Sequence, residues 1–215
     1  MRGCLLFILL MLSMPVSALN TPETKALVAD ELSCELLAKD YIYAETGGTV
    51  PVRMDLVTSV LQDPAFLTHV QDEYEKTLPD GKRPEFSIQQ SAPHTWFYIN
   101  QKRERTDITE VAERMNGADT FDLAYYTQGR RFFGSYQALI HIRLTGKGDS
   151  TDYAVAVYAF PENGFSRFFA RHLPLVERYF QSKTVEISGV AAQISTRLCN
   201  SESLSGDQRL VGPIF

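Results

Sequence analysis

The most regular pattern in the sequence is Tyr136-Gln137-Ala138-Leu139-Ile140-His141-Ile142-Arg143-Leu144, followed by a loop at residues 145–150 and a second run at 152–160. Apolar side chains in the first run alternate with Gln137, His141 and Arg143, which is the period of a strand with one face in the core and one in water. The second run repeats this alternation. Two such runs joined by a short glycine-containing loop predict an antiparallel β-hairpin.

More strands are expected on the N-terminal side of this hairpin. Residues 41–44, 86–90, 95–100 and 121–127 are short runs that contain strong strand formers. A turn is expected at residues 128–131, where a glycine precedes two arginines.

One segment among these strands has helical signals. Asp107 and Glu110 have the spacing of a helix capping box, and Asn116-Gly117 is typical of a helix end. The sequence therefore predicts a helix over residues 107–115.

Helices are also expected before the strands, at residues 21–39, 54–61 and 63–74. Thr21-Pro22 and Asp63-Pro64 each combine a capping side chain with a proline suited to the first helical turn.

The C-terminal part predicts a helix at residues 165–180, kinked at Pro174. Residues 184–188 and 191–198 then form a last strand, or a strand followed by a helix. Residues 201–215 are polar and predict a frayed tail.

The chain has the composition of an ordinary globular protein, with 215 residues, 44% apolar and 22% charged. Helices followed by antiparallel strands predict an α+β fold. We expect a single domain at residues 19–200, in which helices pack a curved antiparallel sheet.

Residues 1–18 predict an N-terminal signal peptide. Arg2 supplies a positive start, residues 5–12 form an apolar run, and Val16 and Ala18 occupy the positions that signal peptidase reads. We expect cleavage after Ala18 and export to the periplasm or the medium. Because the run is shorter than the ~20 residues that cross a bilayer, no membrane span is expected after cleavage.

The charge of the chain disfavours two classes of partner. Loss of the signal peptide makes the chain one unit more negative than the −5 of the full sequence. An acidic balance argues against a nucleic-acid or anionic-lipid surface.

Two cysteines, Cys34 and Cys199, follow the expected cleavage site. An even count in an exported chain predicts one disulfide, which would tie the first helix to the last element. The alternative is two free thiols.

The sequence contains no recognised motif for a cofactor or a metal. The four histidines have no recognised zinc spacing, and there is no phosphate-binding loop and no complete G-x-S-x-G. His69 and Glu73 share a helix face, which fits an exposed polar face better than a metal site. We therefore expect no cofactor and no metal.

The most distinctive segment is residues 121–136, in which two tyrosines end a strand and two arginines precede two aromatic residues. Guanidinium groups and rings together can bind an anion or stack on a flat ligand. The competing interpretation is that the rings fill the core and the arginines pair with acidic neighbours. The candidate binding residues are Trp96, Tyr98, Tyr125, Tyr126, Arg130 and Arg131.

This segment resembles an uncharacterised exported-protein family, a domain of unknown function, of spirochaetes and related bacteria. That family has a similar pattern of Tyr-Tyr, a small polar residue, Arg and an aromatic residue. The resemblance covers the sixteen residues 121–136. It implies an exported setting and supplies no catalytic residues.

The expected function is that of a non-catalytic ligand-binding or accessory protein of the bacterial envelope. Its partner would be an unknown ligand or an envelope protein, and not a nucleic acid. One alternative is a hydrolase acting on a cell-envelope component, with a base among His69, His94 and His141. Another is a structural partner of a second envelope protein.

Overall fold

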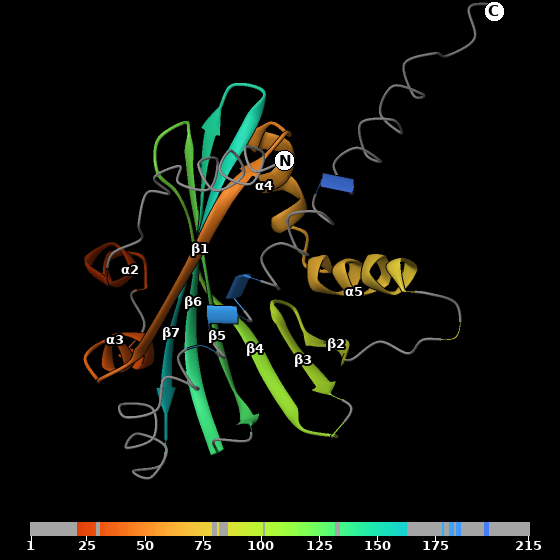
Figure 1. The fold of residues 1–215 in the computed structure, drawn as a ribbon. Coiled ribbons are helices and arrows are strands. Elements are labelled where there is room, and N and C mark those ends of the chain that lie inside the picture. The colour runs from red at the N-terminus through yellow and green to blue at the C-terminus, as the bar shows by residue number, and fades with distance from the viewer. Residues whose placement is uncertain are drawn as a thin grey trace, which may run out of the picture.

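The computed structural model describes residues 21–28, 31–78, 81, 86–100, 102–131, 134–162, 178, 181, 182, 184, 185, 196 and 197. In these residues, seven strands form one antiparallel sheet in the order β1-β7-β6-β5-β4-β3-β2 (Figure 1). The strands are β1 (Ile42–Val50), β2 (Phe86–Ala92), β3 (Thr95–Asn100), β4 (Arg105–Met115), β5 (Thr120–Arg131), β6 (Gly134–Lys147) and β7 (Ser150–Pro161). The helices are α2 (Thr21–Leu27), α3 (Glu31–Leu37), α4 (Met54–Leu61) and α5 (Phe66–Thr77).

The predicted hairpin is confirmed as β6 and β7. The two strands pair continuously from Tyr136 with Pro161 to Lys147 with Ser150. Gly148 lies in the connecting turn with a φ of 69°, a conformation that glycine adopts at no steric cost.

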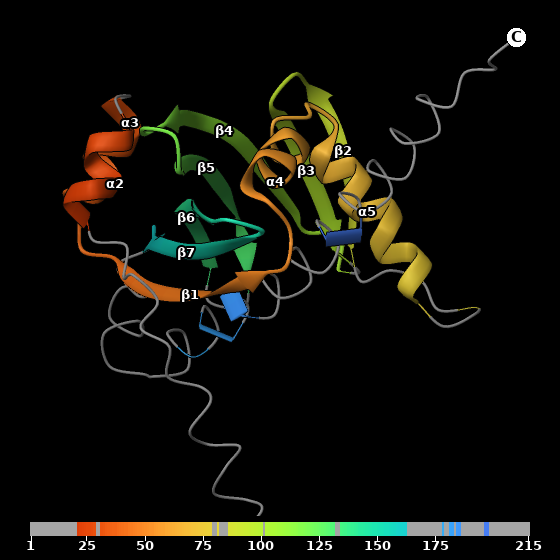
Figure 2. The same cartoon turned by 90° about the horizontal axis from the view of Figure 1, so that it is seen from above.

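The sheet bends around α4 and α5 (Figure 2). We refer to the face that carries Phe121 and Leu123 as the inner face. Val57 of α4 and Phe66 of α5 are buried in one cluster with these two side chains. Burying an apolar side chain of this size stabilises a fold by about 1.5–3 kcal/mol, so this contact holds both helices on the inner face.

The opposite, outer face is covered in part by α2 and α3. Leu27 of α2 and Leu36 of α3 are buried in one cluster with Leu139 and Tyr158 of the sheet. Because successive side chains of a strand point to opposite faces, the sheet contributes apolar side chains to two cores, one on each side.

The N-terminal helices differ from the prediction in one respect. The predicted helix over residues 21–39 is two helices, α2 and α3, whereas those at 54–61 and 63–74 are confirmed as α4 and α5. The Asp63 carboxylate accepts a hydrogen bond from the backbone N–H of Ala65 at 2.8 Å.

The helix predicted at residues 107–115 is wrong, because these residues form most of β4. β4 pairs with β3 on one side and with β5 on the other, and it contains the β-branched Ile108 and Val111. Two ladders of backbone hydrogen bonds outweigh the local capping signal. The predicted turn at 128–131 is also wrong, since β5 continues to Arg131.

The predicted signal peptide at residues 1–18, the tail at 201–215 and all but Arg178 of the helix at 165–180 lie outside the described residues. Thr184 and Val185 are helical, so the strand predicted there is wrong at those positions. Among the described residues, no helix is both long and apolar enough to span a bilayer.

Candidate functional site

A row of four residues crosses the inner face near one end of the sheet. The strand register places Tyr98 opposite Thr106, Thr106 opposite Gly129, and Gly129 opposite Tyr136. Two tyrosines therefore flank two small residues, with all four on neighbouring strands. We refer to these four residues as the tyrosine row.

The guanidinium group of Arg131 lies over this row. Its Cζ atom is 5.3 Å from the ring centroid of Tyr98 and 5.7 Å from that of Tyr136, and its Nη2 donates a hydrogen bond to the Tyr98 hydroxyl. Both ring distances lie within the ~6 Å of a cation–π interaction. A cation beside two rings is suited to an anion or to a flat ligand.

Trp96 and Tyr125 form a second aromatic pair on the inner face. Their centroids are 6.2 Å apart with an interplanar angle of 75°, and Trp96 is 1% exposed. Burial, followed by the charges of Glu110 and Glu113, raises the pKa of Tyr125, so its phenol is neutral. Both rings pack in the core of the inner face.

Two buried polar atoms at this end of the inner face have no hydrogen-bond partner within the described part of the chain. They are Trp96 Nε1 and Thr106 Oγ1, and both residues are 1% exposed. Trp96 precedes Tyr98 by two positions on β3, so it lies next to the tyrosine row on the same face. An indole N–H can only donate, and a buried unpaired polar group costs about 1–3 kcal/mol. Each of the two atoms would be satisfied by an acceptor oxygen placed beside it.

The six predicted binding residues do not form one site. Consecutive strand residues point to opposite faces, so Tyr125-Tyr126 and Arg130-Arg131 are each divided between the two faces. On the outer face, the Tyr126 hydroxyl donates to Gln128 Oε1 at 3.1 Å, and Arg130 is exposed.

Two residues of the site were missed by sequence analysis, Thr106 and Tyr136. Neither belongs to a motif, and only the register of four strands brings them to Arg131. Tyr136 was assigned only to the core face of its strand.

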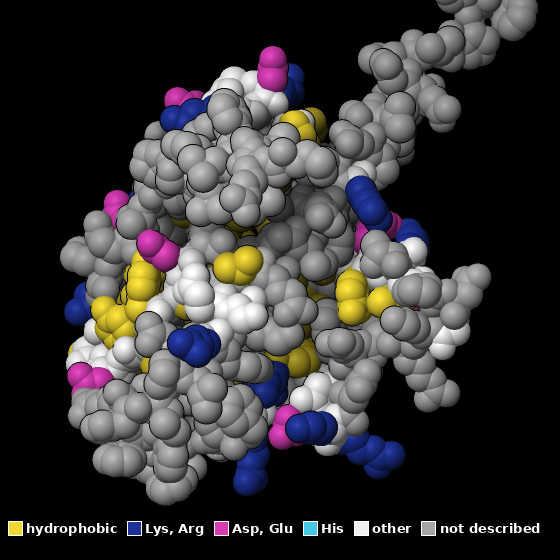
Figure 3. All heavy atoms as spheres, in the orientation of Figure 1, with side chains coloured by type: hydrophobic (Ala, Val, Ile, Leu, Met, Phe, Trp, Pro, Cys, Tyr) yellow, Lys and Arg dark blue, Asp and Glu magenta, His cyan; other side chains and the backbone are white. Residues whose placement is uncertain are grey.

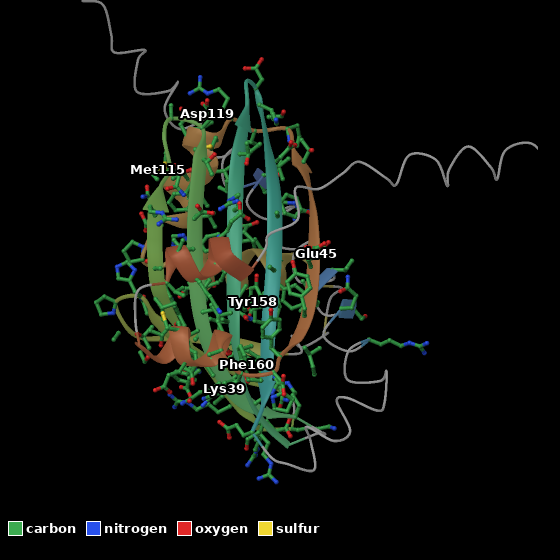
Figure 4. The ribbon with its side chains drawn as sticks, turned by 90° about the vertical axis from the view of Figure 1, so that its left-hand side faces the viewer. Lys39, Glu45, Met115, Asp119, Tyr158 and Phe160 are labelled. Carbon is green, nitrogen blue, oxygen red and sulfur yellow. The ribbon has the colours of Figure 1, made fainter. Side chains whose placement is uncertain are left out.

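A second polar cluster is buried under α2 on the outer face, which Figure 4 views with Tyr158 labelled. His141 Nε2 lies 2.9 Å from Asp122 Oδ1, and its Nδ1 lies 2.9 Å from Thr24 Oγ1. The Thr24 hydroxyl is also 2.9 Å from the Tyr158 hydroxyl. All four residues are 0% exposed. The prediction that this face of β6 is wet is therefore wrong, because α2 covers it.

Arg143 extends this cluster to the surface. Its Nε donates to Asp122 Oδ1 at 2.7 Å and its Nη1 donates to Glu23 Oε1 at 2.9 Å. Burial raises the pKa of Asp122, but hydrogen bonds from His141 and Arg143 outweigh it, and the resulting pKa is about 2. Asp122 is thus ionised at neutral pH, so His141 Nε2 carries the proton that it shares with the carboxylate.

A hydroxyl, an imidazole and a carboxylate in sequence are also the parts of a hydrolase relay. Here Thr24, His141 and Asp122 are each 0% exposed, and Thr24 belongs to the helix that covers the other two. Moving α2 to admit a substrate would take the hydroxyl away from the imidazole. The geometry therefore fits attachment of α2 to the sheet.

The other two candidate bases lie on the surface. His94 Nδ1 is 3.1 Å from Glu110 Oε2, and His69 Nδ1 is 3.4 Å from Asp63 Oδ2. In the ranges that the structure describes, no group of three metal-ligating side chains is found.

Cys34 is exposed, and its sulfur lies 3.5 Å from the carbonyl oxygen of Val28; among the described residues it is bonded to no other cysteine. Cys199 lies outside the described residues, so the disulfide stays a prediction.

No known protein family matches the chain, and no curated protein matches it either. Among solved structures, a conserved protein from Geobacillus kaustophilus has a TM-score of 0.46 and 13% identity, over 74% of this chain and 95% of that chain. Norcoclaurine synthase from Thalictrum flavum has a TM-score of 0.46 and 12% identity, over 78% of this chain and 91% of that chain. Ara h 8.0201 has a TM-score of 0.47 and 12% identity, over 75% of this chain and 99% of that chain. Both measures of similarity are low, so nothing that those proteins bind or catalyse is transferred to this chain.

Proposed function

We propose that this protein is an exported, non-catalytic binding protein of the bacterial envelope, which holds a small organic acid on the inner face beside the tyrosine row. The observation that carries the proposal is the pair of buried, unpartnered atoms Trp96 Nε1 and Thr106 Oγ1 at the end of the sheet where Arg131 lies.

The groups at this end of the sheet define the chemistry of the ligand. Trp96 and Arg131 offer only donors, so the ligand must bring acceptor oxygens, and the positive charge of Arg131 favours an anion. Ile108 packs with Trp96 in the inner-face cluster, which suits an apolar ligand body. A carboxylic acid with an apolar body meets these requirements.

Support for the envelope location comes from the sequence. Residues 1–18 have the charged start, apolar run and small-residue exit of a secretory signal. Cleavage after Ala18 would leave α2 close to the new N-terminus.

The chain itself supplies a reporter for binding, because Trp96 is its only tryptophan. We would titrate the mature chain with decanoate and with decan-1-ol and follow tryptophan fluorescence. Decanoate should change the emission saturably and bind about tenfold or more tightly than the alcohol, since only the acid forms a charge-assisted hydrogen bond.

Arg131→Ala tests the placement of this site. Loss of a hydrogen bond to a charged group costs about 1.5–3 kcal/mol, so the Kd for decanoate should rise about 10- to 150-fold. The control is Arg53→Ala, which removes an exposed arginine whose described partner is Asp55 on the surface. Equal affinity in the wild type and in Arg131→Ala, or no saturable binding of decanoate, would overturn the proposal.

A further inference from the structure

Four exposed cations gather at one end of the sheet. Lys102 and Arg103 lie in the turn between β3 and β4, Arg105 begins β4, and Arg130 is next to the end of β5. Figure 3 shows Lys and Arg side chains along the lower edge of the molecule, where Figure 1 draws this turn. We refer to these four residues as the cationic edge.

The β3–β4 turn holds its cations in a defined geometry. Asn100 Oδ1 accepts hydrogen bonds from the backbone N–H groups of Lys102, at 2.9 Å, and Glu104, at 3.0 Å. Arg103 has a φ of 59°, in the left-handed region that non-glycine residues seldom adopt. One lysine and one arginine side chain are therefore held in a turn whose backbone is fixed by hydrogen bonds.

Two arginines of the cationic edge lie side by side. Thr106 pairs with Gly129, Arg105 precedes Thr106, and Arg130 follows Gly129 on the neighbouring strand. Like charges on neighbouring strands destabilise a sheet unless an anion lies between or above them. Asp107 offsets the charge of Arg105, so Arg130 is the arginine of this pair that an external anion would stabilise.

Nearby carboxylates neutralise only part of this charge. Arg105 Nη2 pairs with Asp107 Oδ1 at 2.6 Å, while Glu104 accepts a hydrogen bond from Asn100 Nδ2. Within the described ranges, no ion pair joins Lys102, Arg103 or Arg130 to an acidic residue. Residues 102–107 together with Arg130 carry four cations and two carboxylates, a formal charge of +2 in a chain of net charge −5.

Apolar side chains stand next to the charges on the outer face. Ile99 is 37% exposed and pairs with Arg105 across the strands. The Arg105 guanidinium lies 4.1 Å from the ring centroid of Phe97. Cations flanked by an exposed aliphatic side chain and a half-buried ring suit a boundary between charged headgroups and hydrocarbon.

We propose that the cationic edge docks this protein on the surface of a bilayer that contains anionic phospholipid. The contact is electrostatic and reversible, with Ile99 reaching the headgroup boundary. It goes beyond the proposed ligand site, which uses the inner face and Arg131. The net negative charge of the whole chain disfavours binding to an anionic surface. Salt screens charges beyond a Debye length of about 10 Å, however, so the attraction to a bilayer depends on the cations that lie closest to it.

The same observations argue against a nucleic acid as the occupant. A nucleic acid is a long polyanion that would extend beyond four residues and meet the acidic remainder of a chain of net charge −5. A membrane can be approached edge-on, with the acidic surfaces pointing away from it.

Vesicle co-sedimentation of the full mature chain tests this docking. Vesicles of phosphatidylglycerol and phosphatidylcholine in equal parts should bind the protein, and pure phosphatidylcholine vesicles should not. Each cation near an anionic surface contributes about 1 kcal/mol, which is about fivefold in the partition coefficient. Lys102→Ala/Arg103→Ala should therefore bind about 25-fold more weakly, and 1 M salt, at a Debye length of about 3 Å, should abolish binding.

The matched control removes the same charge from the other end of the sheet. Lys147 lies at the β6–β7 turn, and Arg53 follows the end of β1, which pairs with the start of β7. Lys147→Ala/Arg53→Ala should bind as the wild type does, and Ile99→Ser should bind several-fold more weakly. Equal loss in both double variants, no difference between the two vesicle types, or binding to a single-stranded DNA oligonucleotide in place of vesicles would overturn the proposal.

Discussion

Thr24 and Thr106 are both buried threonines, but only one of them has its hydroxyl satisfied within the described residues. Thr24 Oγ1 contacts both His141 and Tyr158, whereas Thr106 Oγ1 contacts no hydrogen-bonding partner. The same side chain therefore stabilises the fold at one position and costs free energy at the other. The Thr106 hydroxyl is therefore a group that a bound acceptor would satisfy.

The same substitution at the two threonines should have opposite effects. Thr106→Val removes an unpaired buried hydroxyl and should raise the free energy of unfolding of the ligand-free protein by about 1 kcal/mol. Thr24→Val removes the hydroxyl that contacts His141 and Tyr158 and should lower the free energy of unfolding by about 1–3 kcal/mol. Urea unfolding monitored by circular dichroism measures both changes. Destabilisation of similar size in both variants would show that Thr106 has a structural role.

At the scale of elements, β4 and β5 approach each other closely where Thr106 faces Gly129. A Cβ atom on Gly129 would lie 2.5 Å from Thr106 Oγ1 and 3.3 Å from the carbonyl oxygen of Arg105. The first contact is with a side chain and the second with backbone. Glycine at this position therefore allows the threonine hydroxyl to sit within the tyrosine row.

A double-mutant cycle tests this close approach. Gly129→Ala should destabilise the protein by about 1–3 kcal/mol, because it overpacks the strand pair. In the Thr106→Ala background the cost should fall by about 1 kcal/mol, because the clashing oxygen is gone. Thermal and urea unfolding of the four proteins gives the coupling energy. A coupling of zero would mean that the Arg105 carbonyl, and not Thr106, requires the glycine.

At the scale of the whole molecule, the two faces of the sheet have different roles. The inner face carries the tyrosine row and the helices α4 and α5, and the outer face ties α2 to the sheet through Asp122 and His141. The cationic edge lies at the end of the sheet that also holds Arg131, so the proposed ligand site and the proposed membrane contact are neighbours. If the ligand partitions into a membrane, a protein docked by its cationic edge would have its proposed ligand site close to that membrane.

Global stability should fall in acid because of Asp122. Its pKa is about 2 in the folded protein and about 3.9 in an unfolded chain, so folding favours the ionised form. This contribution, about 2–3 kcal/mol, is present above pH ~4 and is lost as the pH falls through ~2. Urea unfolding across this range should show the loss in the wild type.

Two variants identify the source of the acid sensitivity. Asp122→Asn should be less stable at neutral pH and should lack most of the decline between pH ~4 and ~2. Asp149→Asn changes an exposed carboxylate in the β6–β7 turn and should keep the wild-type profile. An unchanged profile in Asp122→Asn would place the sensitivity elsewhere.

Local patterns in the sequence were sufficient for several elements. Strict alternation in β6 and β7 predicts the hairpin, and Asp63-Pro64 predicts the start of α5, because both signals depend on residues close in the chain. The capping box of Asp107 and Glu110 is equally local, yet the helix that it predicts is absent, because these residues form part of β4. Pairing on both sides, with β3 and with β5, determined that segment, and a capping signal does not report such pairing.

Patterns along the chain predict the α+β class and the antiparallel hairpin, both of which the structure confirms, and they also offer Tyr98 and Arg131 as candidate site residues. Strand pairing places Tyr126 and Arg130 on the outer face and brings Thr106 and Tyr136 into the tyrosine row. The docking of α2 on the sheet buries His141. Thr24 and His141 are separated by 117 positions in the chain. Such contacts follow from strand register and helix docking, which arise from the packing of the whole sheet, and periodicity along one segment carries no information about them.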